Sequence, residues 1–121
     1  MDLKRFTAVD ILEVTIQHSA FEEGQEPIFV MAGPCHIATK KADKARMETI
    51  TKARGKHFDH DKLATAHTSA RVLGWKNVAW EGKSLDWSPE NALMVLATPA
   101  LQFIKDQLHS ALGDDESFFM A

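Results

Sequence analysis

Side chains that could bind a metal ion or move a proton gather in one short stretch of the sequence. They are His57, Asp59, His60, Asp61 and His67. Zinc sites use these residue types, but their signatures pair the ligands at fixed separations, such as two histidines four positions apart on a helix or a CxxC pair. Here His57 and His60 straddle the expected junction of a loop and a helix, and His67 follows about two turns later. We therefore interpret these histidines as polar loop and helix-surface groups, and we expect no metal and no other cofactor.

Motifs for nucleophilic catalysis or nucleotide binding are absent from the sequence. It has no G-x-S-x-G, no phosphate loop and no paired-glycine dinucleotide fingerprint, and it has one cysteine and no tyrosine. Cys35 and His36 are adjacent, but neighbouring side chains in a strand point to opposite faces, so adjacency does not make a nucleophile and a base. Asp86 precedes an expected helix and Glu90 lies at its start, so these carboxylates form no acid–base pair. We predict that the protein is not an enzyme.

Length and composition indicate one domain over residues 1–121. Hydrophobic residues make up 45% of the chain and charged residues 26%, which is ordinary for a globular domain. The net charge of −3 argues against nucleic acid as a partner. No apolar run approaches the roughly 20 residues of a membrane span, so no membrane partner is expected. With a single cysteine and no signal-peptide pattern, we expect a cytoplasmic protein.

The N-terminal part has the pattern of a β-hairpin. Residues 11–17 are rich in β-branched side chains, and residues 27–31 form a second short apolar run, closed by Gly33 and Pro34. A polar, glycine-containing loop joins the two runs. Residues 8–17 also place three apolar side chains at helical spacing, but we favour the strand.

Four helices are expected after the hairpin. They are predicted over residues 38–54, from Asp59 or Asp61 to Leu73, from Ser88 to about Ala97, and from Thr98-Pro99 to about Leu112. Gly55, Gly74 and Gly113 supply the C-terminal stops. The predicted inner faces are Ala42, Ala45, Thr49, Ile50 and Ala53 for the first helix, Leu63, Ala66, His67, Ala70 and Leu73 for the second, and Leu101, Ile104, Leu108 and Leu112 for the last.

All three tryptophans, Trp75, Trp80 and Trp87, lie in the stretch before the third helix. Glu81-Gly82 lies between two short apolar runs and predicts a hairpin-like turn. In the following helix, Ser88 suits the N-cap, Pro89 the first position and Glu90 the positive end of the dipole. We interpret the following residues as structural, with Trp75 and Trp87 in the core: Gly74, Trp75, Trp87, Ser88, Pro89, Glu90 and Asn91. Together these elements predict an α+β fold, mainly helical, in which an N-terminal antiparallel β-hairpin packs on about four helices.

Two surfaces are candidates for binding a partner. Residues 39–62 hold eight Lys or Arg against four Asp or Glu, and Lys40, Lys41 and Lys44 give the first predicted helix a basic face. Such a face is usually only solvated, and partner binding is the alternative. Residues 114–121 are expected to form a flexible acidic tail, and its Phe118 and Phe119 would either dock on a partner or fold back on their own domain.

The order of these features resembles the tail assembly chaperones of long-tailed bacteriophages over roughly residues 12–118. The shared features are a strand ending in His18, a loop closing in Glu26-Pro27, a strand closing in Ala32-Gly33-Pro34, a charged helix, the Val72–Val78 run, a Gly82 turn, Leu85-Asp86-Trp87, Ser88-Pro89-Glu90-Asn91, and a last helix ending near Asp115 and Phe118. The sharpest part is Gly74-Trp75 followed by Ser88-Pro89-Glu90-Asn91. Ser19 departs from the pattern, because a proline is expected at that position.

The resemblance implies a non-enzymatic assembly factor that binds the tape measure protein, keeps it soluble and helps tail-tube subunits gather round it. Self-association into a homo-oligomer would raise the avidity for a long client. For client contact we favour Phe118 and Phe119, and then the face of Lys40, Lys41 and Lys44. The alternative of a different class is a small structural connector retained in the phage or prophage virion. A nucleic-acid-binding module and a metal-dependent hydrolase follow behind it.

Overall fold

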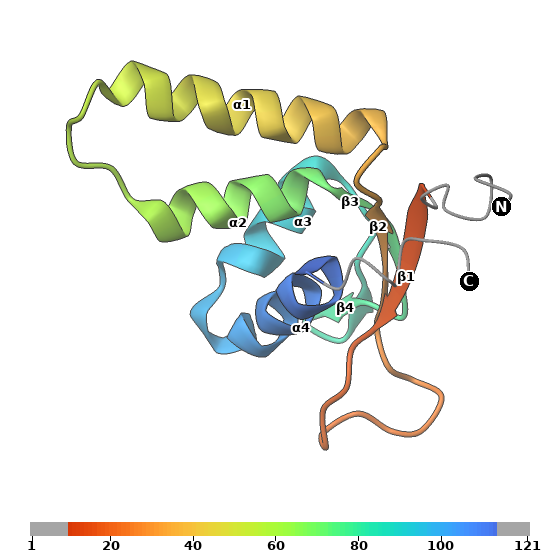
Figure 1. Ribbon diagram of the computed structural model, residues 1–121. Coiled ribbons are helices and arrows are strands. Elements are labelled where there is room, and N and C mark those ends of the chain that lie inside the picture. Colours follow the sequence, from red (N-terminus) through yellow and green to blue (C-terminus); the bar gives the residue numbers. More distant parts are fainter. Residues whose placement is uncertain (1–9, 114–121) are drawn as a thin grey trace, which may run out of the picture.

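The computed structural model describes residues 10–113, in which helices are combined with a small antiparallel sheet (Figure 1). In chain order the elements are β1 (Ile11–Thr15), β2 (Ile28–Ala32), α1 (Ile37–Ala53), α2 (His60–Ala70), β3 (Val72–Lys76), β4 (Ala79–Trp80), β5 (Lys83–Ser84), α3 (Pro89–Ala97), a 3₁₀ turn (Pro99–Leu101) and α4 (Gln102–Gly113). The predicted α+β class is confirmed. The choice of a strand over a helix near residue 11 is confirmed as well.

β2 is the middle strand of a three-stranded sheet, with β1 and β3 antiparallel on either side. The predicted hairpin is the pair of β1 and β2, in which Val14 lies opposite Phe29. Alternate side chains of a strand point to opposite faces, and Phe29 and Met31 of β2 are fully buried. The third strand was not part of the predicted fold.

The prediction that the second helix continues to Leu73 and stops at Gly74 is wrong. α2 ends at Ala70, and Gly74 lies within β3. The apolar spacing of the helix runs on into this strand, so periodicity alone could not separate the two elements. Pairing across the sheet decides the structure, because Trp75 lies opposite Phe29 with the ring centroids 5.5 Å apart in an edge-to-face arrangement.

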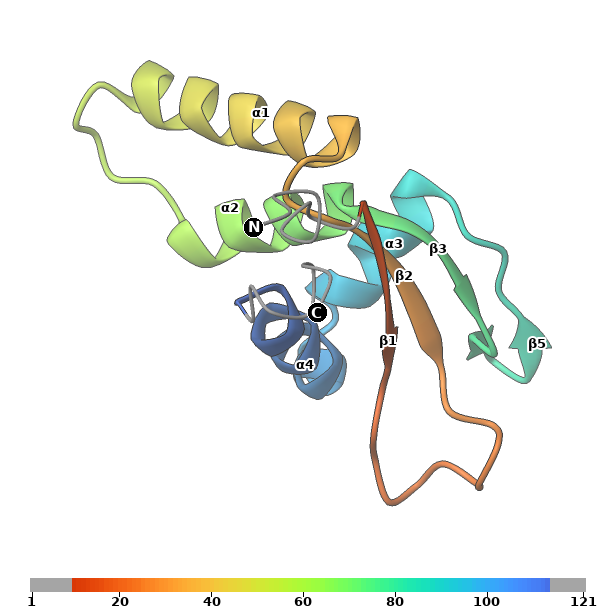
Figure 2. The ribbon, with the colours of Figure 1, turned by 45° about the vertical axis from the view of Figure 1, so that its right-hand side comes forward.

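α3 and α4 pack against the three-stranded sheet and close the hydrophobic core (Figure 2). The buried core consists of Ile16, Phe29, Met31, Val72, Ala92, Val95, Leu96, Ile104 and Leu108. The predicted inner stripe of the last helix is confirmed, since Ile104 and Leu108 are buried and Leu101 and Leu112 pack at the margin. Full burial of one such side chain stabilises the fold by about 1.5–3 kcal/mol, so this cluster is the main support of the domain.

α1 and α2 lie side by side and extend beyond the sheet as a helical arm (Figures 1 and 2). Only Thr39 and Ala42 of the 17 residues of α1 are buried. Of the predicted inner face, Ala42 is buried as expected, whereas Ala45, Thr49 and Ile50 are exposed, and Ile50 is 36% exposed. The predicted stop of this helix is confirmed, because Arg54 and Gly55 both adopt positive φ, 48° and 80°.

The buried face of α2 also differs from the prediction. Thr65, Thr68 and Ser69 are buried, whereas Ala66 is exposed. Each buried hydroxyl makes a hydrogen bond; for example, Thr65 Oγ1 accepts from Lys105 Nζ at 3.1 Å, and Ser69 donates to the Ala66 carbonyl at 3.2 Å. Apolar periodicity misses this face because a hydrogen-bonded hydroxyl can be buried at low cost.

The predicted cap of α3 is confirmed. Ser88 Oγ accepts from the Asn91 N–H at 3.0 Å, Pro89 is the first helical residue and Glu90 lies in the first turn. The Asn91 side chain donates in turn to the Asp86 carbonyl at 2.9 Å. These motif residues therefore build the start of α3.

The last helix was predicted to begin at Thr98-Pro99, which suggests Thr98 as an N-cap, but Thr98 does not cap the turn that follows it. The Thr98 hydroxyl donates back to the Met94 carbonyl at 2.7 Å and makes no cap hydrogen bond to the following turn. A threonine hydroxyl can bond the carbonyl four residues earlier instead of capping forward. The 3₁₀ turn then leads directly into α4.

Candidate functional site

An apolar pocket of about 310 Å³ opens between the β1–β2 loop, β4 and the start of α4. It is lined by Phe21, Gln25, Pro27, Phe29, Asn77, Val78, Ala79, Trp80, Val95, Leu101, Phe103 and Ile104. None of these residues is ionisable, and most are aromatic or aliphatic. This apolar pocket can receive an apolar side chain of a partner, but it offers no acid, base or nucleophile.

The β1–β2 loop is held against α4 and forms one wall of the apolar pocket. The Gln17 N–H donates to Gln107 Oε1 at 2.8 Å, and Gln107 Nε2 donates to the Gln17 carbonyl at 2.7 Å. Beside them the His18, Phe21 and Phe103 rings cluster, with centroids 4.6 Å apart for His18–Phe103 and 6.1 Å apart for Phe21–Phe103. Sequence reasoning interpreted this loop only as a polar connection between two strands. The signal it missed is Phe21, an aromatic residue in an otherwise acidic loop.

The β4–β5 hairpin forms the opposite wall. Its turn is Glu81-Gly82, as predicted, with φ angles of 53° and 79°. A type I′ turn needs positive φ at both central residues. Trp80 directly precedes the turn, lines the apolar pocket and is 37% exposed. A partly exposed indole beside an apolar pocket is a strong contact for a partner's side chain.

The tryptophans differ in their environment. Trp75 packs against the core, as predicted, and its Nε1 donates to the Leu85 carbonyl at 2.8 Å. Trp87 is 39% exposed, so its predicted place in the core is wrong. Leu85, two residues before Trp87, is the side chain of this segment that packs against the core.

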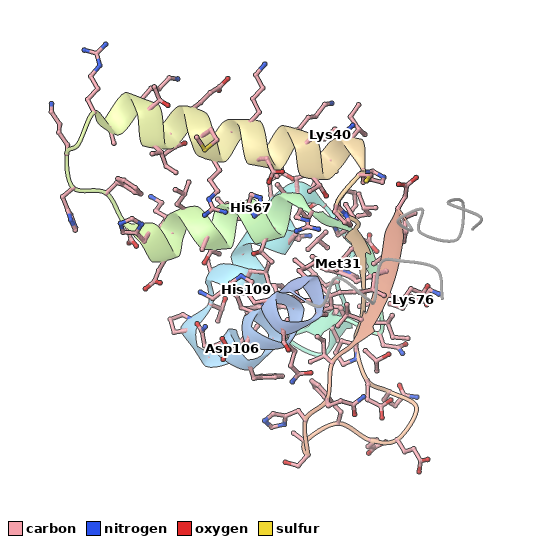
Figure 3. All side chains as sticks on the ribbon, viewed as in Figure 1. Met31, Lys40, His67, Lys76, Asp106 and His109 are labelled. Carbon is pink, nitrogen blue, oxygen red and sulfur yellow. The ribbon has the colours of Figure 1, made fainter. Side chains whose placement is uncertain are left out.

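A second exposed surface runs along the outer side of α1. Lys40, Lys41 and Lys44 are all exposed there, and Figure 3 places Lys40 near the start of the helix. Ile37 and Met47 are 64% and 59% exposed. Positions separated by three or four residues lie along one side of a helix, so Ile37, Lys40, Lys44 and Met47 form one line. We call this mixed cationic and apolar surface the basic stripe.

The apolar pocket and the basic stripe are separate surfaces. α1 lies at one end of the molecule and the β1–β2 loop at the other (Figure 1). Phe118 and Phe119, the other predicted partner-binding residues, lie outside the described residues, as does the whole predicted tail 114–121.

The histidines singled out in the sequence do not form one site. His67 Nε2 lies 2.6 Å from Asp43 Oδ1 and links α2 to α1, whereas the His60 ring lies 4.4 Å from that of Phe58. Within residues 10–113, no three His, Cys, Asp or Glu side chains are arranged to hold a metal ion.

A polar groove of about 520 Å³ lies between α1, α2 and the end of α4. Figure 3 shows His67 on α2 and His109 on α4, and both line this groove. His109, which sequence reasoning missed, contacts the buried Thr68 hydroxyl through Nε2 at 2.7 Å. Burial is the main cause that lowers the pKa of His109; Lys105 adds to this effect and Asp106 opposes it.

Comparison of the chain with protein-family models, with curated proteins and with solved structures finds no match in any of the three. Among residues 10–113, no helix is both long enough and apolar enough to cross a membrane. Function is therefore inferred from the apolar pocket and the basic stripe.

Proposed function

We propose that the protein is a non-enzymatic assembly chaperone of the phage-tail kind, which binds apolar segments of the tape measure protein. The observation that carries the proposal is the apolar pocket. It is open to solvent beside Trp80, which is 37% exposed, and it has no ionisable lining residue. Such a pocket masks an apolar side chain of a client without any chemical step.

A helical client fits this pocket through one large apolar residue. Amphipathic helices bind grooves through apolar anchors three or four positions apart. The basic stripe supplies a second contact on the same chain, because Ile37 and Met47 are exposed beside its lysines. Two contacts at opposite ends of the domain, repeated in a homo-oligomer, raise the avidity for a long client.

In the proposed setting, the bacterial host cytoplasm, the client stays soluble while tail-tube subunits gather round it. The experiment is co-expression with the tape measure protein encoded nearest this gene, followed by a pull-down and measurement of affinity. Recovery of a soluble complex by the full chain supports the proposal. A client that stays insoluble and unbound contradicts it, and detection of the chain in purified virions then favours the structural connector.

Two exposed tryptophans provide a matched pair of variants. Trp80 and Trp87 are exposed to 37% and 39%, but only Trp80 lines the apolar pocket. We expect Trp80→Ala to weaken client binding by about 2 kcal/mol, roughly thirtyfold, as for an interface hot spot. Trp87→Ala is expected to leave the affinity unchanged. Equal effects of the two variants would remove the pocket from the proposal.

The basic stripe and the tail are tested in the same pull-down. Lys40→Glu combined with Lys44→Glu reverses the charge of the stripe, and Lys52→Glu combined with Lys62→Glu makes the same charge change at exposed positions outside the stripe. If only the Lys40→Glu/Lys44→Glu variant loses client binding, the basic stripe contacts the client. A chain ending at Gly113 tests Phe118 and Phe119.

A further inference from the structure

The polar groove contains an arginine whose charge is not matched by an acid. Arg71 follows α2, lines the groove and is only 9% exposed. Its Nε and Nη2 both donate to a single acceptor, the Ala32 carbonyl, at 3.2 and 2.9 Å. A guanidinium carries five N–H groups, and residues 10–113 supply no acceptor for Nη1. No carboxylate in this part of the chain lies within ion-pair distance of Arg71.

Nη1 of Arg71 is not fully buried. In the described part of the chain, no fully buried side-chain nitrogen or oxygen lacks a hydrogen-bond partner. Nη1 therefore keeps some contact with solvent. Arg71 is also one of the residues that line the groove. Burial lowers the pKa of Arg71, and Asp43 offsets this in part. A largely buried cation without a counter-ion favours the binding of an anion.

The rest of the groove combines a second cation with apolar side chains. Arg46 of α1 is exposed and lines it. The acids nearby are Asp61, which also lines the groove, and Asp43, which is engaged by His67 at 2.6 Å. The apolar part of the wall consists of Ile50, Leu63 and Leu112. A ligand that fits carries carboxylates next to apolar groups, because arginine pairs with carboxylates in a bidentate manner.

We propose that the polar groove is the docking site of the acidic and aromatic segment Asp114–Phe119 of the same chain, with its carboxylates on Arg71 and Arg46. Gly113 lines the groove, and the sequence that follows it is Asp-Asp-Glu-Ser-Phe-Phe. Three extended residues span about 10 Å, which is enough to bring these carboxylates from Gly113 into a groove of about 520 Å³. Docking there withholds Phe118 and Phe119 from other partners. It involves no client, so it stands or falls independently of the chaperone function.

The test uses nuclear magnetic resonance of the full-length chain and follows the Nε–Hε signals of Arg46 and Arg71. The variant D114N/D115N/E116Q removes the three charges of the segment without changing its size. We expect both arginine signals to move in this variant, and we expect a synthetic peptide with the sequence of residues 114–121 to restore them. Arg71 itself is left intact because it also holds Ala32.

Arg46→Gln and Lys52→Gln form the matched pair for the peptide titration. Each removes one charge from an exposed position of α1, but only Arg46 lines the groove. In the background of the neutral segment, Arg46→Gln is expected to weaken peptide binding about tenfold, and Lys52→Gln to leave it within about twofold.

Several results would overturn the assignment. Identical arginine signals in the wild type and in the neutral-segment variant show that the segment does not dock. Signals that depend on protein concentration show that it comes from a second copy. Inorganic phosphate that shifts the arginines equally in both chains shows a general small-anion site.

Discussion

Arg71 and Ala32 are joined by hydrogen bonds from both the backbone and the Arg71 side chain. The Ala32 N–H donates to the Arg71 carbonyl at 2.7 Å, and Nε and Nη2 of Arg71 donate to the Ala32 carbonyl at 3.2 and 2.9 Å. The pair joins the end of β2 to the start of β3, where the register of the two strands shifts between Val30 and Met31. The arginine side chain therefore supplies donors to the Ala32 carbonyl next to an irregular point of the sheet.

Arg71→Met is expected to lower the free energy of unfolding by about 2–3 kcal/mol, because it removes two charge-assisted hydrogen bonds from a buried carbonyl. Arg71→Lys is expected to fall between this variant and the wild type, because an ammonium lacks the guanidinium fork. Urea unfolding provides the measurement. Lys41→Met, at an exposed site, is the control and should stay within about 0.5 kcal/mol. A stable Arg71→Met chain would show that the pair contributes little.

Trp75→Phe keeps an aromatic ring against Phe29 but loses the hydrogen bond from Nε1 to the Leu85 carbonyl. We expect a loss of about 1–2 kcal/mol in chemical unfolding. Trp87→Phe at a 39% exposed position is expected to change stability by less than about 0.5 kcal/mol. The reverse order of the two variants would contradict the environments described for these tryptophans.

Ser88→Ala removes the oxygen that accepts from the Asn91 N–H at 3.0 Å. The expected loss is about 1 kcal/mol, as for other N-caps. Ser88→Asp keeps an acceptor at this position and adds a charge at the positive end of the helix dipole, so it should unfold at nearly the wild-type urea concentration. Equal destabilisation by both variants would mean that the cap is not the cause.

The pH dependence of stability is expected to include a contribution from His109. Its pKa in the folded state lies below the ordinary value of 6.5, mainly because of burial. As the pH falls below about 6.5, His109 of the unfolded chain binds a proton before His109 of the folded chain does. The free energy of unfolding therefore decreases toward acid and levels off below the pKa of the folded state.

The measurement compares urea unfolding of the wild type and His109→Gln between pH 8 and pH 5. The wild type should lose more stability than the variant as the pH is lowered. Gln is the chosen substitute because its side chain retains a hydrogen-bonding group for Thr68 without titrating. Parallel pH profiles of the two chains would exclude His109 as the source.

Several local elements could be predicted because their signals lie within a few residues. Ser88 and Pro89 mark the start of α3, since a cap depends only on the first helical turn. Glu81-Gly82 marks the β4–β5 turn for the same reason, because the turn needs two residues that tolerate positive φ. The stripe centred on Ile104 and Leu108 also predicted the inner face of α4 correctly.

The errors occur where one pattern suits two structures. Leu73 continues the apolar spacing of α2, yet it lies in β3, because the edge of β2 supplies hydrogen-bond partners that the isolated sequence does not reveal. Thr65 and Thr68 have no place in an apolar pattern, but their hydroxyls find partners in Lys105 and His109 and can be buried.

What the sequence determined by itself is the α+β class, the caps and turns, and the faces of the most strongly patterned elements. Only the tertiary structure decided which surfaces remain open and what lines them. The apolar pocket depends on a loop held to α4 by Gln17 and Gln107, which are 90 positions apart, and the polar groove depends on Arg71, which is held by Ala32 39 positions away. Contacts at such separations arise only when burial of the common core brings the elements together, and no local pattern of residues encodes them.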